Sequence, residues 1–136
     1  MTRTSPRIQA FFDALDIRPS DRILEVGCGQ GVLASLICER LAPGVGFYLA
    51  IDRSKAMIEA ATRRNRRFIE GGVAVFQISD FETLDLGSQT FDKVVAMRVR
   101  WFHDHPEDAH RHARRWLAPS GKVHVVYDEP EAKPLA

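Results

Sequence analysis

Three glycines close to one another give the first sign of chemistry in this sequence. Gly27, Gly29 and Gly31 alternate with Cys28 and Gln30 directly after an apolar segment, and an apolar helical pattern follows them. Glycine lets the backbone turn tightly and approach a ligand closely, and the first turn of the next helix offers free N–H groups. The segment therefore predicts a loop that binds a small molecule through its backbone.

Two carboxylates accompany this loop. Asp52 ends the second apolar segment, about 20 residues beyond Gly31, where a carboxylate can accept hydrogen bonds from both hydroxyls of an adenosine ribose. Glu25 lies inside the first apolar segment, and burying it is costly unless it is paired or hydrogen-bonded. A dinucleotide fingerprint would also need glycine at position 32, where this chain has Val32. Nicotinamide dinucleotide binding is therefore a disfavoured alternative, because Glu25 would repel its pyrophosphate.

The elements that position these residues alternate between strand and helix. Apolar patterns predict β-strands over 22–26, 47–51, 73–78, 92–99 and 122–127. Helices are predicted to begin at Pro6, after Gly31, after Ser54 and at Pro106. We expect one α/β domain over 1–136: an opening helix and linker (1–20), a core (21–127) and a tail (128–136). The core should be a doubly wound, mostly parallel sheet of about five strands in the order 3-2-1-4-5, with helices on both faces.

Two helix ends and one turn are also predicted. The helix after Ser54 should dissolve over 63–67, where four arginines favour a solvated end. The helix from Pro106 should extend its buried stripe to Trp116 and Leu117, and 119–121 should then turn the chain into the fifth strand.

Length and charge restrict the partners. The chain has 136 residues, 19 basic and 18 acidic side chains, and a formal net charge of +1. This balance gives no field that favours nucleic acid or a membrane surface. The N-terminal residues lack the apolar core of a signal peptide, and Cys28 and Cys38 are interpreted as free thiols in a reducing compartment. We therefore expect a cytoplasmic protein that binds a small molecule and neither nucleic acid nor a membrane.

At this point the chain resembles the class I, Rossmann-like methyltransferases that use S-adenosylmethionine (SAM), particularly the small stand-alone members that act on small molecules. The resemblance extends from about residue 8 to 127. The matching segments are Ile23–Gly31, Asp52–Ser54 with Met57, Ser79–Phe81, Phe91–Val95 and Trp116–Gly121. Each segment is weak alone, whereas their shared order and spacing are specific.

The resemblance implies a SAM site, with S-adenosylhomocysteine (SAH) as the product. Glu25 and the three glycines would border the methionine part, and Asp52 would bind the ribose. Asp80 would accept a hydrogen bond from the adenine amino group, and the Phe81 N–H would donate to the ring. The other residues expected at the cofactor are Met57 on the adenosine, the backbone of Met97 and Arg98 near the methionine amine, and Cys28 and Arg53 within the matching motifs.

Ordinary structural roles remain open for several of these residues. Gly31 would also admit close helix packing, Met57 would also suit a core position, and Asp80 would also form a turn. At the end of the fourth strand, Arg98 or Arg100 would suit an anionic acceptor and Trp101 a flat one. A salt-bridged arginine and a packing tryptophan are the alternatives.

A group of histidines raises the question of a metal or a base. We expect no metal, because residues 110 and 112 point to different faces of a helix and no cysteine lies near His103, Asp104 and His105. His103 is the single candidate for a general base. Methyl transfer from a sulfonium mainly requires that donor and acceptor are held in line, so no dedicated catalytic residue is required.

Two function hypotheses follow. The first is a SAM-dependent methyltransferase that acts on an oxygen, nitrogen or carbon nucleophile of a small molecule. Relatives usually continue past the fifth strand with a helix and two more strands that contribute to the acceptor pocket, so the sequence also suggests truncation there. The second hypothesis is therefore a non-catalytic or truncated SAM-binding module that needs a partner.

The fifth strand should be a sheet edge, and we predict that it recruits a second copy. Val123, Val125 and Val126 offer an apolar edge with unpaired backbone groups, which favours a homodimer; Lys122 and His124 would instead blunt the edge in a monomer. Light scattering across a concentration series should give a dimeric mass, and a strictly monomeric mass would contradict the dimer. If a dimer survives Val125→Pro with an intact circular dichroism spectrum, it associates through another surface.

Overall fold

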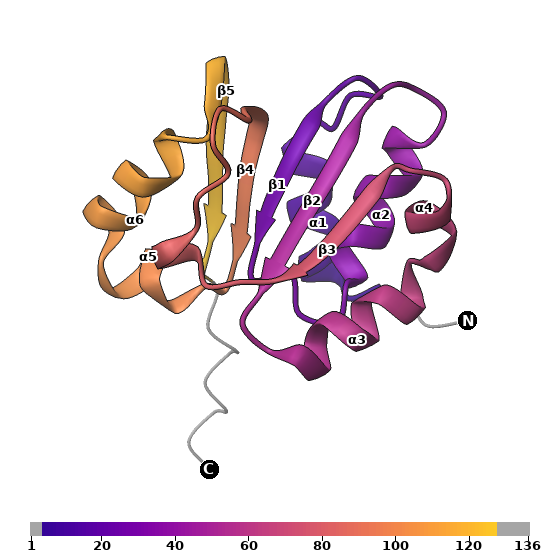
Figure 1. The fold of residues 1–136 in the computed structure, drawn as a ribbon, viewed down its shortest axis with the longest axis horizontal. Helices are drawn as coiled ribbons and strands as arrows, with labels where there is room; N and C mark the ends of the chain where they lie inside the picture. The colour runs from indigo at the N-terminus through magenta and orange to yellow at the C-terminus, as the bar shows by residue number, and fades with distance from the viewer. Residues whose placement is uncertain (1–3, 128–136) are drawn as a thin grey trace.

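The computed structural model describes residues 4–127, which form a five-stranded parallel sheet in the order β3-β2-β1-β4-β5 (Figure 1). The strands are β1 (Arg22–Val26), β2 (Phe47–Asp52), β3 (Ala74–Ile78), β4 (Phe91–Met97) and β5 (Leu117–Val126). The helices are α1 (Pro6–Leu15), α2 (Val32–Leu41), α3 (Lys55–Arg64), α4 (Arg66–Glu70), the 3₁₀ turn η1 (Phe81–Thr83), α5 (Arg100–Asp104) and α6 (Pro106–Arg114). The predicted strand order is confirmed, whereas the tail predicted over 128–136 lies outside the described residues.

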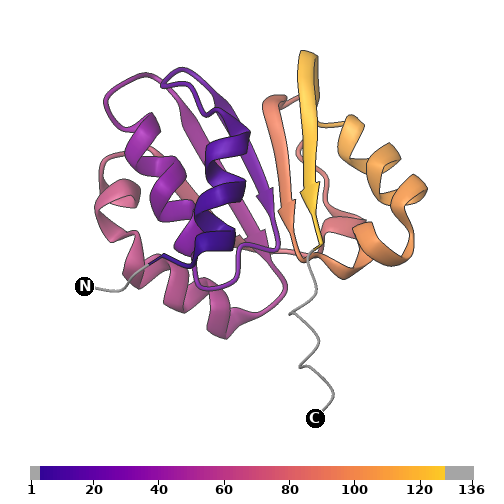
Figure 2. The ribbon, with the colours of Figure 1, turned by 180° about the vertical axis from the view of Figure 1, so that it is seen from behind.

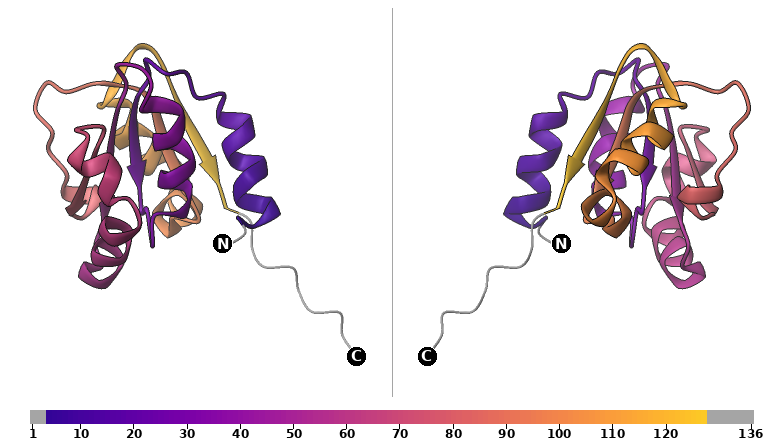
Figure 3. Two further views of the ribbon diagram at one scale, coloured as in Figure 1. Left: turned by 90° about the vertical axis from the view of Figure 1, so that its right-hand side faces the viewer. Right: turned by 90° about the vertical axis from the view of Figure 1, so that its left-hand side faces the viewer.

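Helices cover both faces of the sheet, because neighbouring side chains of a strand point to opposite faces. Ile23 belongs to the apolar cluster shared with α1 and α2, which lie in front of the strands in Figure 2. The next residue, Leu24, belongs to the cluster shared with α6. Figure 3 shows α1 and α6 on opposite sides of β5. The predicted doubly wound arrangement is therefore confirmed.

Serine side chains fix the starts of two helices as the sequence predicts. Ser5 Oγ accepts a hydrogen bond from the Ile8 N–H at 3.2 Å, and Ser54 Oγ accepts one from the Met57 N–H at 3.2 Å. Each bond satisfies a donor that the helix itself leaves free. The Ser54 cap starts α3 immediately after the end of β2, so the helix departs from the edge of the sheet where Asp52 lies.

The glycine loop packs too closely on α3 to carry a side chain at its last position. Gly31 has a φ of +81°, and a Cβ atom there would lie 2.7 Å from Asn65 Nδ2 and 2.9 Å from the Cβ of Ala61. Side chains are strained at such a φ, and non-bonded atoms do not approach so closely. The helix-packing role left open for Gly31 is therefore confirmed.

The end of β4 differs from the prediction. The strand stops at Met97 and not at Val99, because Arg98 adopts a left-handed φ of +59° that turns the chain out of the sheet. The Arg98 N–H still donates to the Val126 carbonyl at 2.8 Å, which ties this turn to β5. The unpredicted helix α5 follows directly, and it forms one wall of the site described below.

Three other boundaries also need correction. The helix after Ser54 does not dissolve over 63–67: α3 ends at Arg64 and α4 begins at Arg66, and α4 is anchored by the buried Phe68. Helix α6 ends at Arg114, so the buried Trp116 lies beyond it. The expected turn over 119–121 lies inside β5, next to an irregularity in its register with β4 between Phe91 and Lys93. Proline, serine and glycine are typical of turns, but proline and glycine also occur at irregular positions of edge strands, as they do here.

Within residues 4–127, every helix falls short of the length and apolar character needed to cross a lipid bilayer. Cys28 and Cys38 are both free, as the sequence predicts, and both are buried.

The packing of Gly31 on α3 predicts a large loss of stability in Gly31→Ala. Strain at positive φ is about 1–2 kcal/mol, and the overlap with Asn65 and Ala61 should add about 1–3 kcal/mol. Gly72→Ala is the matched control, because Gly72 has a φ of +77° and nothing lies within 4 Å of its missing Cβ. Urea unfolding should show the larger loss for Gly31→Ala, and equal losses would contradict the close packing.

Candidate cofactor and acceptor site

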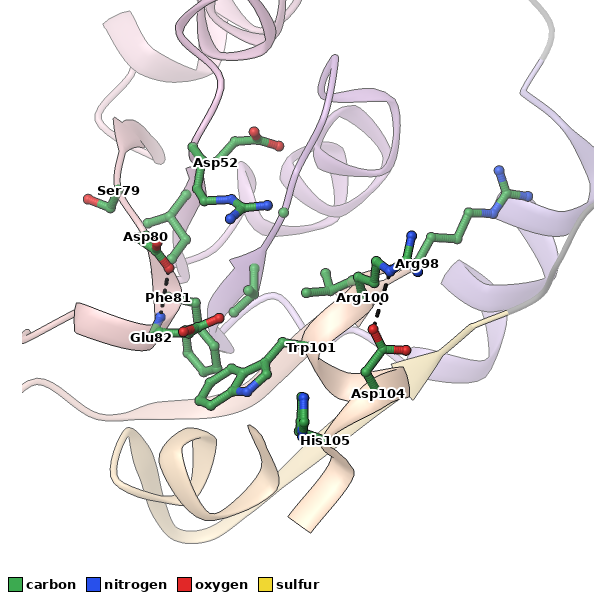
Figure 4. A pocket seen from close by; sticks show the side chains of 15 residues that line it. Asp52, Ser79, Asp80, Phe81, Glu82, Arg98, Arg100, Trp101, Asp104 and His105 are labelled. Carbon is green, nitrogen blue, oxygen red and sulfur yellow. Dashed lines mark hydrogen bonds and ion pairs between the residues drawn. The ribbon is translucent and has the colours of Figure 1, made fainter. Parts of the chain in front are cut away.

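A cavity of about 430 Å³ opens at the carboxyl ends of the strands (Figure 4). Its wall includes Gly27 after β1, Asp52 at the end of β2, Asp80 and Phe81 after β3, and Arg98 after β4. All five strands are parallel, so their carboxyl ends meet at one edge, where ligands of open α/β sheets bind. The volume is in the usual range for small-molecule sites.

The structure brings part of the predicted site together at this cavity. The predicted residues that line it are Gly27, Asp52, Arg53, Asp80, Phe81 and Arg98. The predicted residues that do not line it are Glu25, Cys28, Gly29, Gly31, Met57, Met97 and His103. The first group includes Asp52 and Asp80, whereas most of the second group lies in or beside the glycine loop.

Asp52 joins the glycine loop to β2. Its Oδ2 accepts a hydrogen bond from the Gly29 N–H at 2.9 Å, and its Oδ1 accepts one from the Ser54 N–H at 2.9 Å. A carboxylate has about four lone-pair positions, so each oxygen retains capacity for another donor. Asp52 can therefore hold the loop and accept ligand hydroxyl groups at the same time.

Asp80 and Phe81 form a second corner of the cavity. Asp80 Oδ1 accepts a hydrogen bond from the Glu82 N–H at 3.0 Å and caps η1, so the turn-forming role left open for Asp80 is confirmed. Phe81 is buried, and its ring meets the Trp101 indole edge-on with 5.7 Å between centroids (Figure 4). This aromatic contact fixes the wall that joins η1 to α5.

Glu25 lies behind the glycine loop and away from the cavity. Only 2% of the residue is exposed, and the Tyr48 hydroxyl donates a hydrogen bond to its Oε1 at 2.6 Å. Burial raises the pKa of Glu25 to about 8, the Tyr48 bond lowers it and the charge of Asp52 raises it further. The carboxyl group is therefore mainly protonated at neutral pH in this structure. A buried Glu25 needs a hydrogen bond, and Tyr48 provides it, whereas the expected position of Glu25 beside the methionine part of the cofactor stays a prediction.

The cysteines have structural environments. Burial raises the pKa of both the Cys28 and Cys38 thiols, and the charge of Glu25 raises both further. The Cys28 thiol donates to the Gly29 carbonyl at 3.6 Å. Both thiols therefore stay protonated and unreactive, Cys28 within the glycine loop and Cys38 in α2.

The histidines separate into different environments. His103 stacks on Tyr127 with 4.0 Å between ring centroids, whereas the exposed His105 lines the cavity. In the described part of the chain, no three His, Cys, Asp or Glu residues are grouped to hold a metal ion. The role of His103 as a base stays a prediction.

Sequence reasoning missed part of the wall that α5 provides. Trp101 and Asp104 line the cavity together because positions i and i+3 share one side of a helix, and His105, which directly follows α5, lines it beside them. The segment 100–104 gave too short a pattern to predict this helix. Arg100 Nε donates to Asp104 Oδ2 at 3.2 Å, so the salt-bridged arginine left open by the sequence is confirmed at this position.

Comparison with known proteins identifies the family. Residues 23–121 match the family model described as a methyltransferase domain. The chain belongs to this family. The match covers the glycine loop, Asp52, Asp80 and the α5 wall, so it includes every strand end that borders the cavity.

Individual relatives of this methyltransferase-domain chain are longer. Nocamycin O-methyltransferase of Saccharothrix syringae is 33% identical over 126 residues, which cover 92% of this chain and 44% of that protein. Coclaurine N-methyltransferase, solved with N-methylheliamine and SAH, has a TM-score of 0.74 at 18% identity, covering 88% of this chain and 34% of that one. The cyclase SpnF has a TM-score of 0.71 at 22% identity, covering 88% and 43%. This chain spans a third to about half of the first curated relatives that it matches.

The burial of Glu25 predicts a pH-dependent stability. Because its pKa is about 8 in the folded state and about 4.5 when unfolded, only the folded state holds this proton between those values. The contribution of Glu25 to the free energy of unfolding should therefore fall from about pH 5 to about pH 8, by up to about 1.4 kcal/mol per pH unit.

Glu25→Gln removes this titration and keeps an acceptor for Tyr48, so urea unfolding should show the variant gaining on the wild type as the pH rises. Glu59→Gln, an exposed position on α3, is the control and should follow the wild type. A pH-independent difference between the wild type and Glu25→Gln would show that Glu25 ionises normally.

Proposed function

We propose that this chain binds SAM in the cavity at the carboxyl ends of the strands and transfers its methyl group to a small-molecule acceptor, with SAH as the product. The observation that carries the proposal is the convergence of Asp52, Asp80, Phe81 and Gly27 on one cavity. These residues come from three separate strand ends, and the family match includes all of them. SAH is bound to several structural neighbours of this fold.

The adenosine part of SAM would lie between the ends of β2 and β3. Asp52 would accept hydrogen bonds from the ribose hydroxyls, with Arg53 beside it, while Asp80 and the Phe81 N–H would recognise the adenine. Met57, half-buried on α3, would support the adenosine from outside the present cavity wall. Each contact uses lone pairs or donors that remain after the internal bonds described above.

The methionine part would extend from the ribose toward the glycine loop and β4. Gly27, Gly29 and Gly31, with Cys28 and Glu25 behind them, would border it, and the backbone of Met97 and Arg98 would approach its amine. Glu25 would meet the cofactor's positive charge only after losing the proton that burial favours.

The acceptor would enter next to α5. Arg98, Arg100 and Trp101 line this end of the cavity, with Asp104 and His105 beside them. The nocamycin and coclaurine enzymes named above act on small molecules, which supports an acceptor of that kind.

We include in the proposal a cytoplasmic location, no nucleic-acid or membrane partner, and a homodimer through β5. The possible base His103 would need to leave its stacking contact with Tyr127.

A second candidate is a SAM-binding module that does not transfer a methyl group. The structural likeness to the cyclase SpnF supports this alternative, because it shows the same fold in a protein named for a different reaction. Transfer of the labelled methyl group of SAM to any acceptor in a panel of phenols and amines, by this chain alone, would decide for the methyltransferase.

SAM and SAH should bind the chain, and NAD should not. Isothermal titration calorimetry on the full chain measures all three dissociation constants, and mass spectrometry of the purified protein would detect retained SAM or SAH. Tighter binding of NAD than of SAH would overturn the proposed site.

Asp52→Ala should weaken SAH binding at least about tenfold, because each hydrogen bond to a charged group contributes about 1.5–3 kcal/mol. Asp85→Ala is the matched control, since Asp85 also accepts a backbone N–H from two residues ahead, in an exposed turn. Calorimetry should show normal affinity for the control. An unchanged dissociation constant in Asp52→Ala would remove this residue from the site.

A further inference from the structure

The end of α3 holds the glycine loop through a fully buried amide. Asn65 has 0% exposure, and its Nδ2 donates to the Gly31 carbonyl at 3.1 Å and to the Ala61 carbonyl at 3.0 Å. Its Oδ1 accepts a hydrogen bond from Ser35 Oγ at 2.8 Å. Both amide hydrogens and the amide oxygen are therefore used, each on a different element: the loop, α3 and α2.

The preceding residue adds a second bond to the same loop. Arg64 Nε donates to the Gln30 carbonyl at 3.2 Å. Consecutive residues at the end of α3 thus hold consecutive carbonyls of the loop, Gln30 and Gly31. The opposite end of the loop is fixed by β2, because the Gly27 N–H donates to the Ile51 carbonyl at 2.8 Å.

The Gly31 and Asn65 positions fit each other in shape as well as in hydrogen bonding. The missing side chain of Gly31 leaves the space that the Asn65 amide occupies. A buried amide is costly unless every polar atom is satisfied, and a satisfied one fixes a single arrangement of the groups around it. The Gly31 carbonyl also accepts hydrogen bonds from the Ser35 N–H and the Ser35 hydroxyl of α2, both at 3.1 Å. The Asn65 amide adds the bond that ties this carbonyl to the end of α3, which an apolar residue of the same size would not make.

We infer that Asn65 is a positioning residue that acts through Gly31 to set the glycine loop for the amino-acid part of the cofactor. Asn65 does not line the cavity and would not touch the ligand. This inference rests on the proposed function, in which the loop borders the methionine part while Asp52, Asp80 and Phe81 hold the adenosine. Loss of Asn65 should therefore affect the two parts of the cofactor unequally.

The test compares two ligands that share the adenosine part. SAH carries the amino acid, and 5′-methylthioadenosine lacks it. For Asn65→Ala, calorimetry should show an SAH dissociation constant raised about tenfold or more, with less than about a threefold change for 5′-methylthioadenosine. A variant that binds both ligands as the wild type does, or loses both equally, overturns the inference.

Two further variants keep the test decisive. Ile58→Ala truncates a buried, purely apolar side chain of α3. It should lower the stability of the protein without changing the ratio of the dissociation constants for SAH and 5′-methylthioadenosine. Ser35→Ala removes the hydroxyl that lies 2.8 Å from Asn65 Oδ1 and 3.1 Å from the Gly31 carbonyl. Because it loosens both the Asn65 amide and the loop carbonyl that this amide holds, it should change the ratio in the same direction as Asn65→Ala, by about twofold to fivefold. If Asn65→Ala does not fold, an unchanged ratio in Ser35→Ala overturns the inference.

The wild-type chain separates this inference from the function on which it rests. Wild-type protein that binds neither ligand overturns the proposed function, whatever the variants show. Wild-type protein that binds SAH, together with an unchanged affinity ratio in the variants, overturns only the role of Asn65.

Discussion

Gly31 packs against the end of α3 so closely that no side chain fits at position 31. The arrangement of the site depends on this contact. Helix α3 begins next to Asp52 and ends at the Asn65 amide, so a single helix connects the acid at the end of β2 to the far end of the glycine loop. Asp52 binds the same loop at Gly29. The loop is therefore held at two places by two consecutive elements, at Gly29 by the end of β2 and at Gly31 by the end of α3, and its backbone has little freedom to change.

This constraint explains how a short chain can present a preformed cavity. The strand ends supply the positions of Asp52, Asp80 and Arg98, and internal hydrogen bonds from backbone N–H groups orient the two acids. Preformed sites bind more tightly because less freedom is lost on binding. Glu25 contributes in a different way: it lies behind the loop, where burial raises its pKa, and the acids that line the cavity are Asp52, Asp80, Glu82 and Asp104.

Local patterns in the sequence were sufficient for most of the fold. Apolar runs predicted all five strands, and the serine caps predicted the starts of α1 and α3, because both signals depend on neighbouring residues. Sequence also identified Asp52, Asp80 and Phe81, which stand at strand ends where a parallel sheet must gather them. Asp52 was therefore predictable from the topology, whereas Asp80 and Phe81 were predicted through the family resemblance.

The features that escaped prediction depend on contacts between distant segments. Helix α5 is too short for a periodic signal, and the left-handed turn at Arg98 is stabilised by a bond to Val126 in β5. Asn65 lay in an arginine-rich stretch that suggested a solvated helix end, and only the folded chain brings its amide against Gly31. Glu25 was expected to face the ligand, whereas its partner Tyr48 comes from the neighbouring strand.

The crystal structure of this chain with SAH would test the central claim most directly. We expect SAH in the cavity at the carboxyl ends of the strands, with both ribose hydroxyls within hydrogen-bond distance of Asp52 and the amino acid against the glycine loop. SAH bound elsewhere, or bound in this cavity with its ribose away from Asp52, would contradict the proposed site.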